Sequence, residues 1–314
     1  MARAQSQAAR ADPIAGQRLY VEPNSPAAQA VRQLQAAGDA RDAQLLERIA
    51  GQPTATWFAN DSPFVQSHVS SLTSLAGARG ELPVLVAYDI PKRDCGSGYS
   101  SGGAAGAADY FAWIGRLSSG IGTRRAVVIL EPDAIPGALS GCLSATAARD
   151  RFALLKQAVA IFKRDPGAVV YIDVGNSNWI ASPARLVTPL HEAGIAMADG
   201  FALNVANFQS TAASVAYGDR LAHLLGGRSR GVHFVIDTSR NGHGPDVNPG
   251  DGPNWCNPPG RALGHAPTTS TGQPLVDAYL WVKRPGESDG RCRPGAPPAG
   301  QFWTQYALGL AAAQ

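Results

Sequence analysis

The stretch VVILEPDAIP, Val127 to Pro136, contains the pattern that decides the fold. Four branched apolar residues without alternation are typical of a strand buried on both faces, as in a parallel sheet covered by helices. The run ends on Glu131, Pro132 and Asp133. Proline has no backbone N–H and a fixed φ, so strand pairing should stop there. The pattern therefore predicts a buried strand that brings two carboxyl groups to the edge of a sheet.

Similar apolar runs recur along the chain, with amphipathic or Ala-rich stretches between them. We expect strands within residues 54–58, 82–88, 126–131, 168–173, 200–205, 232–237 and 277–282. We expect helices within residues 27–50, 103–117, 145–163, 183–193, 211–225 and 301–313. This alternation predicts an α/β fold with parallel strands inside a layer of helices. A closed or nearly closed barrel is favoured, and a doubly wound open sheet is the alternative.

Length and charge limit the classes of protein to which the chain can belong. Its 314 residues are 45% hydrophobic, its net charge is +3, and no break in composition marks a second domain. We expect an N-terminal segment over residues 1–20 that need not be ordered, followed by a single domain over residues 21–314. The absence of like-charge runs argues against a nucleic-acid-binding face, and no apolar segment is long enough to span a membrane.

The N-terminus and the cysteines bear on cellular location. Residues 1–19 lack the apolar region of a signal peptide, so the protein is either cytosolic or shown here without its export signal. The four cysteines, Cys95, Cys142, Cys256 and Cys292, contain no C-x-x-C pair, which argues against a zinc ribbon. Two disulfides in an exported enzyme and four buried free thiols fit the spacing equally well.

Polar and aromatic side chains follow the predicted strands, where parallel α/β folds place their sites. They include Trp57, Tyr88, Asp94, Glu131, Asp133, Asp173, Trp179, Asn207, Asp237, Lys283, Glu287 and Asp289. Carboxylates and amides can bind sugar hydroxyls, and indole rings can pack on the C–H faces of sugar rings. Two carboxyl groups can together hydrolyse a glycosidic bond. Because Asp133 follows an apolar strand and lies near other acids, we expect its pKa to be raised, as a proton donor requires.

Three other patterns are weaker. GYSSG, residues 98–102, matches the G-x-S-x-G nucleophile elbow, but Ser100 lies in a glycine-rich loop well beyond the predicted strand. The six histidines are scattered and form no metal-binding motif. Acids at strand ends could bind Mg²⁺ for phosphoryl transfer, but the neighbouring tryptophans argue against that chemistry. We therefore expect neither a metal nor a cofactor.

Seven motifs, spread from about Trp57 to Tyr306, resemble those of glycoside hydrolase family 6, the inverting cellulases. They are YDIPKRDC (88–95), LEPDAI (130–135), YIDVGNSNW (171–179), NVANF (204–208), DTSRNG (237–242), WCNPPGR (255–261) and WVKRPGESDG (281–290). The resemblance implies a distorted seven-stranded parallel β/α barrel with an open substrate cleft at the C-terminal ends of the strands. That architecture agrees with the number of strands expected above.

The resemblance also implies roles for single residues. Asp133 would be the general acid, and Asp94 would keep it protonated and help to activate water. Tyr88 would favour distortion of the sugar ring, and Asp289 is a carboxylate sometimes proposed as the base. Asp173 would support the acid or the substrate. Contacts with the substrate are implied for Trp57, Trp179, Asn207, Trp255, Lys283, Glu287 and Ser100, the last in a loop that closes over the site.

The same resemblance pairs Cys95 with Cys142 and Cys256 with Cys292, which favours disulfides and export. The spans between the paired cysteines, 46 and 35 residues, are short, and this favours an open cleft. The expected protein is a secreted, monomeric endo-β-1,4-glucanase that inverts the anomeric configuration of its glucan substrate. A cellobiohydrolase of the same family is the alternative, followed by a non-catalytic glucan-binding protein and a serine esterase.

Several details remain open at this stage. Phe208 stands where a tyrosine is common in the family, and Asn176 stands where a histidine is common, so subsite details differ. Glu131 is expected to accept hydrogen bonds from the backbone or from an arginine. Asp237 and Arg240 are expected to form an ion pair with each other or to contact the substrate.

Overall fold

The computed structural model describes residues 11–60, 62–95, 98–226, 231–248, 250 and 252–313. Seven parallel strands form one sheet in chain order. They are β1 (Thr56–Ala59), β2 (Val84–Tyr88), β3 (Ala126–Leu130), β4 (Ala168–Asp173), β5 (Gly200–Leu203), β6 (His233–Asp237) and β7 (Val276–Leu280). All of the predicted strands are therefore confirmed, with small shifts of their ends. The expectation that pairing stops at Pro132 is also confirmed, because β3 ends at Leu130.

Helices follow each strand from β1 to β5, two more precede β1 and one follows β7 in the described residues. They are α1 (Pro26–Ala36), α2 (Ala40–Ala50), α3 (Val65–Ala78), α4 (Ala107–Ile121), α5 (Ala134–Leu139), α6 (Ala145–Phe162), α7 (Ala184–Glu192), α8 (Thr211–Leu224) and α10 (Thr304–Ala312). The stretch predicted as one helix over residues 27–50 is divided in two. Gly38 adopts a φ of 80°, and the Asp39 side chain caps α2 by accepting a hydrogen bond from the backbone N–H of Asp42.

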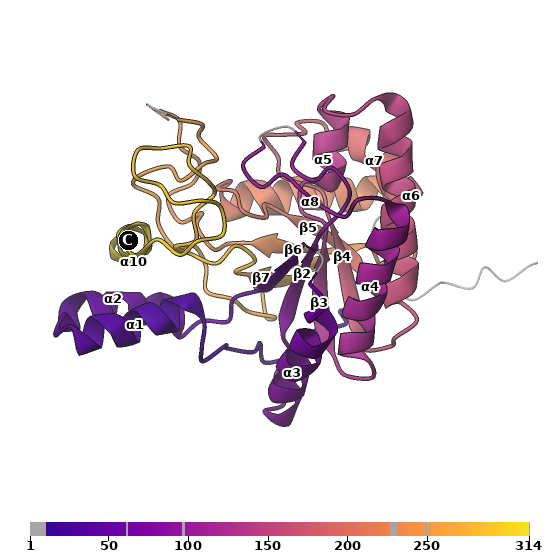
Figure 1. The fold of residues 1–314 in the computed structure, drawn as a ribbon. Helices are drawn as coiled ribbons and strands as arrows, with labels where there is room; N and C mark the ends of the chain where they lie inside the picture. The colour runs from indigo at the N-terminus through magenta and orange to yellow at the C-terminus, as the bar shows by residue number, and fades with distance from the viewer. Residues whose placement is uncertain are drawn as a thin grey trace, which may run out of the picture.

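Apolar side chains alternate between the two faces of the strands, as the pleat requires. Val127 and Ile129 of β3 point into the barrel, whereas Val128 and Leu130 pack under the outer helices. A separate apolar cluster, which includes Leu46 and Trp281, joins α1, α2 and α10. In Figure 1 these three helices form a group on one side of the sheet, away from α4, α6 and α7.

The barrel has a seam between β7 and β1. In the part of the chain that the structure describes, β1 pairs with β2 alone and β7 pairs with β6 alone. Two hydrogen bonds bridge the seam: the backbone N–H of Ala55 donates to the Trp281 carbonyl at 3.0 Å, and Trp57 Nε1 donates to the Val282 carbonyl at 2.7 Å. A doubly wound sheet would reverse its strand order, and this sheet does not. The distorted barrel is therefore confirmed.

The described part of the N-terminal segment covers the amino ends of the strands. The Ile14 side chain joins the apolar cluster inside the barrel. The backbone N–H of Tyr20 donates to the Leu82 carbonyl at 3.0 Å, just before β2. Arg125, just before β3, donates to the Pro13 carbonyl at 2.6 Å. Residues 1–10 of the segment predicted over 1–20 lie outside the described residues. Among the described helices, none is both long enough and apolar enough to cross a bilayer.

Candidate active site

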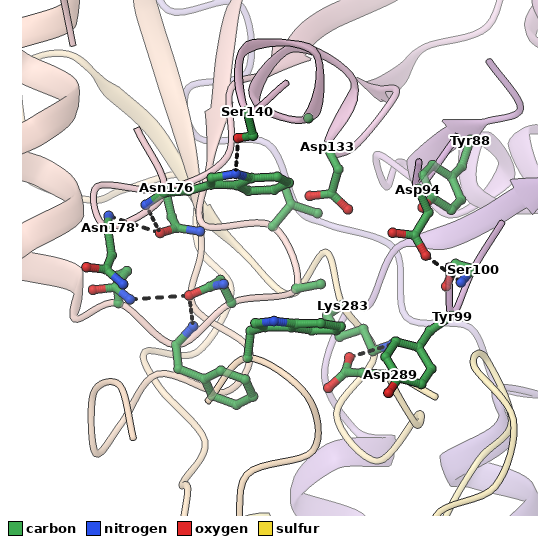
Figure 2. Close-up of a pocket in the computed structure, with 18 of the residues that line it drawn as sticks. Tyr88, Asp94, Tyr99, Ser100, Asp133, Ser140, Asn176, Asn178, Lys283 and Asp289 are labelled. Carbon is green, nitrogen blue, oxygen red and sulfur yellow. Dashed lines mark hydrogen bonds and ion pairs between the residues drawn. The ribbon is translucent and has the colours of Figure 1, made fainter. Parts of the chain in front are cut away.

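A cavity of about 550 Å³ lies at the carboxyl ends of the strands. Most of the predicted site residues line it: Trp57, Tyr88, Asp94, Ser100, Asp133, Trp179, Asn207, Trp255, Lys283 and Asp289. Figure 2 shows Asp133 and Asp94 close to one another near Tyr88, with Lys283 and Asp289 lying together across the same space. The structure therefore brings the three predicted carboxyl groups of the reaction into one cleft.

Two predicted residues, Asp173 and Glu287, do not line the cavity. Asp173 is buried beneath it, and its Oδ2 accepts hydrogen bonds from the backbone N–H groups of Asp133 at 2.8 Å and Gly175 at 3.1 Å. Glu287 is buried in an ion pair with Arg284, 2.7 Å away. Asp173 thus holds the segment that carries Asp133, which is one of the two roles implied for it. Glu287 faces Arg284 because the chain turns back between these two residues.

Asp133 is presented to the cavity by an unusual backbone turn. Glu131 and Asp133 both have positive φ values, 49° and 69°, on either side of Pro132. Such values are uncommon for residues other than glycine and store strain at functional sites. The turn leaves Glu131 fully buried and Asp133 half-buried at the cavity wall. The direction of the Asp133 side chain therefore depends on local backbone geometry that the rest of the fold must stabilise.

The surroundings of Asp133 favour its protonated form. Burial raises the pKa of Asp133 from 3.8 to about 7, the negative charges of Asp94 and then Asp289 contribute to the rise, and the charge of Lys283 opposes it. Asp94 is held nearby by the backbone N–H of Ser100, which donates to its Oδ2 at 2.6 Å. A carboxyl group that keeps its proton near neutral pH can act as a general acid.

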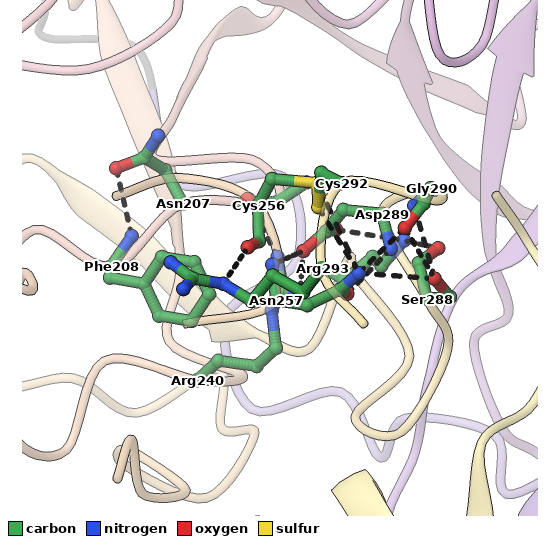
Figure 3. Close-up of polar contacts among 12 residues, drawn as sticks. Asn207, Phe208, Arg240, Cys256, Asn257, Ser288, Asp289, Gly290, Cys292 and Arg293 are labelled. Carbon is green, nitrogen blue, oxygen red and sulfur yellow. Dashed lines mark hydrogen bonds and ion pairs between the residues drawn. A yellow bond between two sulfur atoms is a disulfide. The ribbon is translucent and has the colours of Figure 1, made fainter. Parts of the chain in front are cut away.

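Asp289 has the opposite surroundings, shown in Figure 3. Its Oδ2 accepts hydrogen bonds from Arg240 Nη1 at 2.7 Å and from the backbone N–H of Asn257 at 3.0 Å, and Lys283 Nζ lies 3.2 Å from its Oδ1. Although burial alone would raise it, the pKa of Asp289 is lowered below 3.8 by Arg240 and then by Lys283. Asp289 therefore stays ionised while Asp133 keeps its proton.

Arg240 forms an ion pair with Asp289 and not with Asp237. The expected ion pair between Asp237 and Arg240 is therefore wrong. The Asp237 carboxylate accepts hydrogen bonds from the backbone N–H groups of Ala206, Ser239 and Lys283 instead. It lies beneath the cavity and holds the loops that follow β5 and β7.

Three tryptophans supply aromatic surface to the cavity. The indole N–H of Trp57 is bound to the Val282 carbonyl, and that of Trp179 donates to Ser140 Oγ at 2.6 Å. These bonds fix the orientation of both rings. The Trp255 ring meets the Tyr99 ring edge-on, with 5.8 Å between centroids. The cavity therefore combines fixed apolar rings with carboxyl, amide and ammonium groups.

Several lining residues escaped the sequence analysis: Tyr99, Ser140, Arg151, Gln209, Pro245 and Asn254. Tyr99 belongs to the GYSSG stretch, where attention to its aromatic side chain would have found it. Arg151 lies on α6, far along the chain from any strand end, so the rule based on strand ends gave no signal for it. Ser100 lies in the loop after Asp94 and not at the tip of a strand, which removes the basis for a nucleophile elbow.

Two disulfides tie the loops around the cavity. Cys95 is bonded to Cys142, and Cys256 is bonded to Cys292. The predicted pairing is confirmed, and the alternative of four free thiols is wrong. In the described ranges, no group of three or more histidines, cysteines, aspartates or glutamates is placed to hold a metal ion.

Comparisons with known proteins point to one family. The family model described as Glycosyl hydrolases family 6 matches residues 14–314. Endoglucanase A from Cellulomonas fimi is 43% identical over 295 residues, which is 93% of this chain but 60% of that protein, so the chain spans less than two thirds of that relative.

Solved structures give the same result. The endoglucanase Cel6 from Mycobacterium tuberculosis, solved in complex with methyl-cellobiosyl-4-deoxy-4-thio-β-D-cellobioside, is 45% identical with a TM-score of 0.88, and the match covers 97% of this chain and 100% of that one. The catalytic core of the cellobiohydrolase Cel6A from Chaetomium thermophilum is 25% identical with a TM-score of 0.81, covering 96% and 98% of the two chains.

Proposed function

The chain belongs to glycosyl hydrolase family 6, and from that premise we propose that it is an inverting endo-β-1,4-glucanase with Asp133 as its proton donor. One observation carries the proposal: Asp133 and Asp289 line one cleft in opposite surroundings. Asp133 is half-buried near Asp94, which raises its pKa. Asp289 instead forms ion pairs with Arg240 and Lys283, which lower its pKa. Such a difference separates an acid from a permanently charged group. Relatives named endoglucanases at 43% and 45% identity support the endo mode.

In the proposed reaction, Asp133 gives its proton to the oxygen of the scissile glycosidic bond. A water molecule attacks the anomeric carbon from the opposite face of the sugar, so the configuration inverts. We assign acceptance of the water proton to Asp94, directly or through a second water. Asp289 is less suited to this role, because Arg240 and Lys283 engage its two oxygens. Lys283 also stabilises the negative charge that Asp133 acquires.

The aromatic rings and polar groups of the cavity suit a glucan chain. We assign Trp57, Trp179 and Trp255 to sugar rings, and Asn207 and Lys283 to sugar hydroxyls. Tyr88 packs edge-on against Trp57, with 5.4 Å between ring centroids, and this contact holds it where a bound sugar would be crowded. The two disulfides support export, because such bonds persist in oxidising compartments.

The proposal is tested with Asp133→Asn, assayed on carboxymethylcellulose. We expect loss of nearly all hydrolysis with an unchanged circular dichroism spectrum, because the amide cannot donate a proton to the leaving oxygen. Asp109→Asn, which changes an exposed acid on α4, serves as the matched control and should keep full activity. Near-normal hydrolysis by Asp133→Asn would refute the assignment. NMR of fresh product should show α-configured ends, and β-configured ends would contradict inversion.

A further inference from the structure

The hydrogen bonding between β2 and β3 departs from the regular parallel pattern at Glu131. In a regular parallel ladder, a residue donates its N–H to a carbonyl of the neighbouring strand. Its own carbonyl then accepts the N–H of the residue two positions further along that same neighbouring strand. Glu131 donates its N–H to the Ala87 carbonyl at 2.8 Å, so its carbonyl should accept from Asp89. Because Glu131 has a φ of 49°, that carbonyl turns away and accepts from the Ala134 N–H at 3.1 Å. The ladder therefore loses its next bond.

The Glu131 side chain takes the place of the missing carbonyl. Both of its carboxylate oxygens lie 3.0 Å from the backbone nitrogen of Asp89, and Oε2 also accepts from the Ile90 N–H at 3.0 Å. The side chain is completely buried, so bulk water cannot substitute for it. Without it, two buried N–H groups would lose their partner, which is unfavourable.

The hydrogen bonds between Glu131 and the backbone of Asp89 and Ile90 connect two segments, and each segment carries a carboxyl group of the cleft. Downstream, Asp133 follows Glu131 by two positions, and its own N–H is bound by Asp173. Upstream, Asp89 and Ile90 begin the segment that ends at Asp94. Arg151 holds the middle of that segment by donating to the carbonyls of residues 91 and 92 at 2.9 and 2.8 Å.

We propose that Glu131 is a positioning residue: by holding the segment after β2 against the turn after β3, it sets the separation between Asp94 and Asp133. This inference rests on the roles proposed above for these two residues. The charge of Asp94 favours the protonated form of Asp133 only while the two groups stay close, so the position of the segment that carries Asp94 matters for the proton donor. The Cys95–Cys142 disulfide holds the end of this segment next to Asp94, and Glu131 holds its start. Without Glu131, the start of the segment shifts and Asp94 recedes from Asp133.

The pKa of Asp133 reports this separation. After burial, the charge of Asp94 is the largest influence that raises it. When Asp94 recedes, the pKa of Asp133 falls towards its ordinary value, and the proton donor ionises at a lower pH. A role of Glu131 limited to stability would not move this pKa.

The experiment compares Glu131→Ala, which removes both acceptor oxygens, with Glu131→Gln, which keeps one. Asp199→Ala is the matched control: Asp199 is also buried and accepts a backbone N–H, from Val170 at 2.8 Å, but it lies at the amino end of β5. The pKa of the Asp133 carboxyl is followed by ¹³C NMR in the free protein. In parallel, kcat and KM are measured against pH on a soluble cello-oligosaccharide.

For Glu131→Ala we expect a pKa of Asp133 lower by about one unit and a fall in kcat of roughly 10- to 100-fold with little change in KM, because misplaced groups lose rate more than binding. Glu131→Gln should show a smaller fall in the pKa of Asp133 and a smaller fall in kcat. Asp199→Ala should lose stability and keep the wild-type pKa and pH profile.

An unchanged pKa of Asp133 in Glu131→Ala overturns the proposal, as does an equal change in Asp199→Ala. If Glu131→Ala does not fold, the Glu131→Gln variant decides, and an unshifted pKa there also overturns it. Failure of the proposed function has a different signature: the wild type hydrolyses no glucan, while the NMR titration still tests the positioning role of Glu131.

Discussion

Glu131 and Asp133 are two positions apart and have different chemical surroundings. The pKa values of both are raised chiefly by burial, to about 8 and about 7. The Glu131 oxygens are occupied by backbone N–H groups, whereas Asp133 faces the cavity. Access to the cavity, more than the size of the pKa shift, therefore separates the proposed proton donor from the residue that holds its surroundings.

The raised pKa of Asp133 predicts a stability effect whose sign depends on pH. Below its unfolded pKa of about 4, both states hold the proton and Asp133 has no effect. As pH rises from there to about 7, the unfolded state loses the proton first, so the native state becomes relatively less stable, and above about 7 the full penalty remains.

We therefore expect Asp133→Asn to be more stable than the wild type at about pH 8, by on the order of 1 kcal/mol after allowance for solvent screening. Near pH 4 the two proteins should be equally stable, because neutral Asp and Asn then have similar effects. Urea unfolding at both pH values measures the difference. A variant with the same advantage, or none, at both pH values contradicts the assignment of a raised pKa.

Strands were easier to predict than side-chain directions. Every strand was predicted, because short apolar runs such as VVIL alternate along the chain with longer amphipathic stretches, and this alternation indicates strands between helices. Helix α3 was missed because it contains four serines, which favour helices weakly, although Val65, Val69, Leu72 and Ala76 form its buried face. The expectation that Glu131 accepts backbone hydrogen bonds is confirmed. Asp173 and Asp237 resembled cleft residues, but they bind backbone N–H groups below the cavity. The positive φ values that leave Glu131 buried and Asp133 at the cavity wall have no signature in the sequence.

Contact between α8 and β6 depends on a glycine. A Cβ atom at Gly218 would lie 2.2 Å from the Phe234 ring, so the helix approaches the strand at this point more closely than alanine allows. At Gly115 in α4, no atom beyond its chain neighbours and its own helix backbone lies within 4 Å of the corresponding position.

We expect Gly218→Ala to lower the free energy of unfolding by roughly 1–3 kcal/mol through overpacking, despite the better helix propensity of alanine. Gly115→Ala, the matched control, should raise it by about 0.5–1 kcal/mol, since only propensity acts there. Urea unfolding of the two variants should give effects of opposite sign. A stabilised Gly218→Ala variant is incompatible with close packing of α8 on Phe234.

Buried carboxyl groups at the strand ends tie the cleft loops together along the sheet. Each accepts a backbone N–H from the end of a neighbouring strand or its following loop: Asp89 from Asn60, Glu131 from Asp89, Asp173 from Asp133, and Asp237 from both Ala206 and Lys283. These links join the loops of β1 to β4 and of β5 to β7. They account for the acids that follow strands in the described residues without lining the cavity.

The shape of the cleft bears on whether the proposed enzyme would cut a glucan internally or at its ends. The disulfide-linked cysteines are separated by only 47 and 36 positions, which leaves little chain to roof the site, and the Trp179 side chain remains 39% exposed. In the proposed endo mode, a glucan chain would enter sideways, without threading an end. We expect carboxymethylcellulose to lose viscosity steeply for each reducing end formed, because internal cuts shorten long chains quickly.

Viscometry and a reducing-end assay on the same sample measure this ratio, with Asp133→Asn as the blank. An enzyme that acts from chain ends releases reducing ends while viscosity stays nearly constant, and the carboxymethyl groups soon block it. That outcome would assign the chain to the cellobiohydrolase alternative and leave Asp133 as the proton donor, because the chemistry of the strand ends does not depend on how the substrate enters.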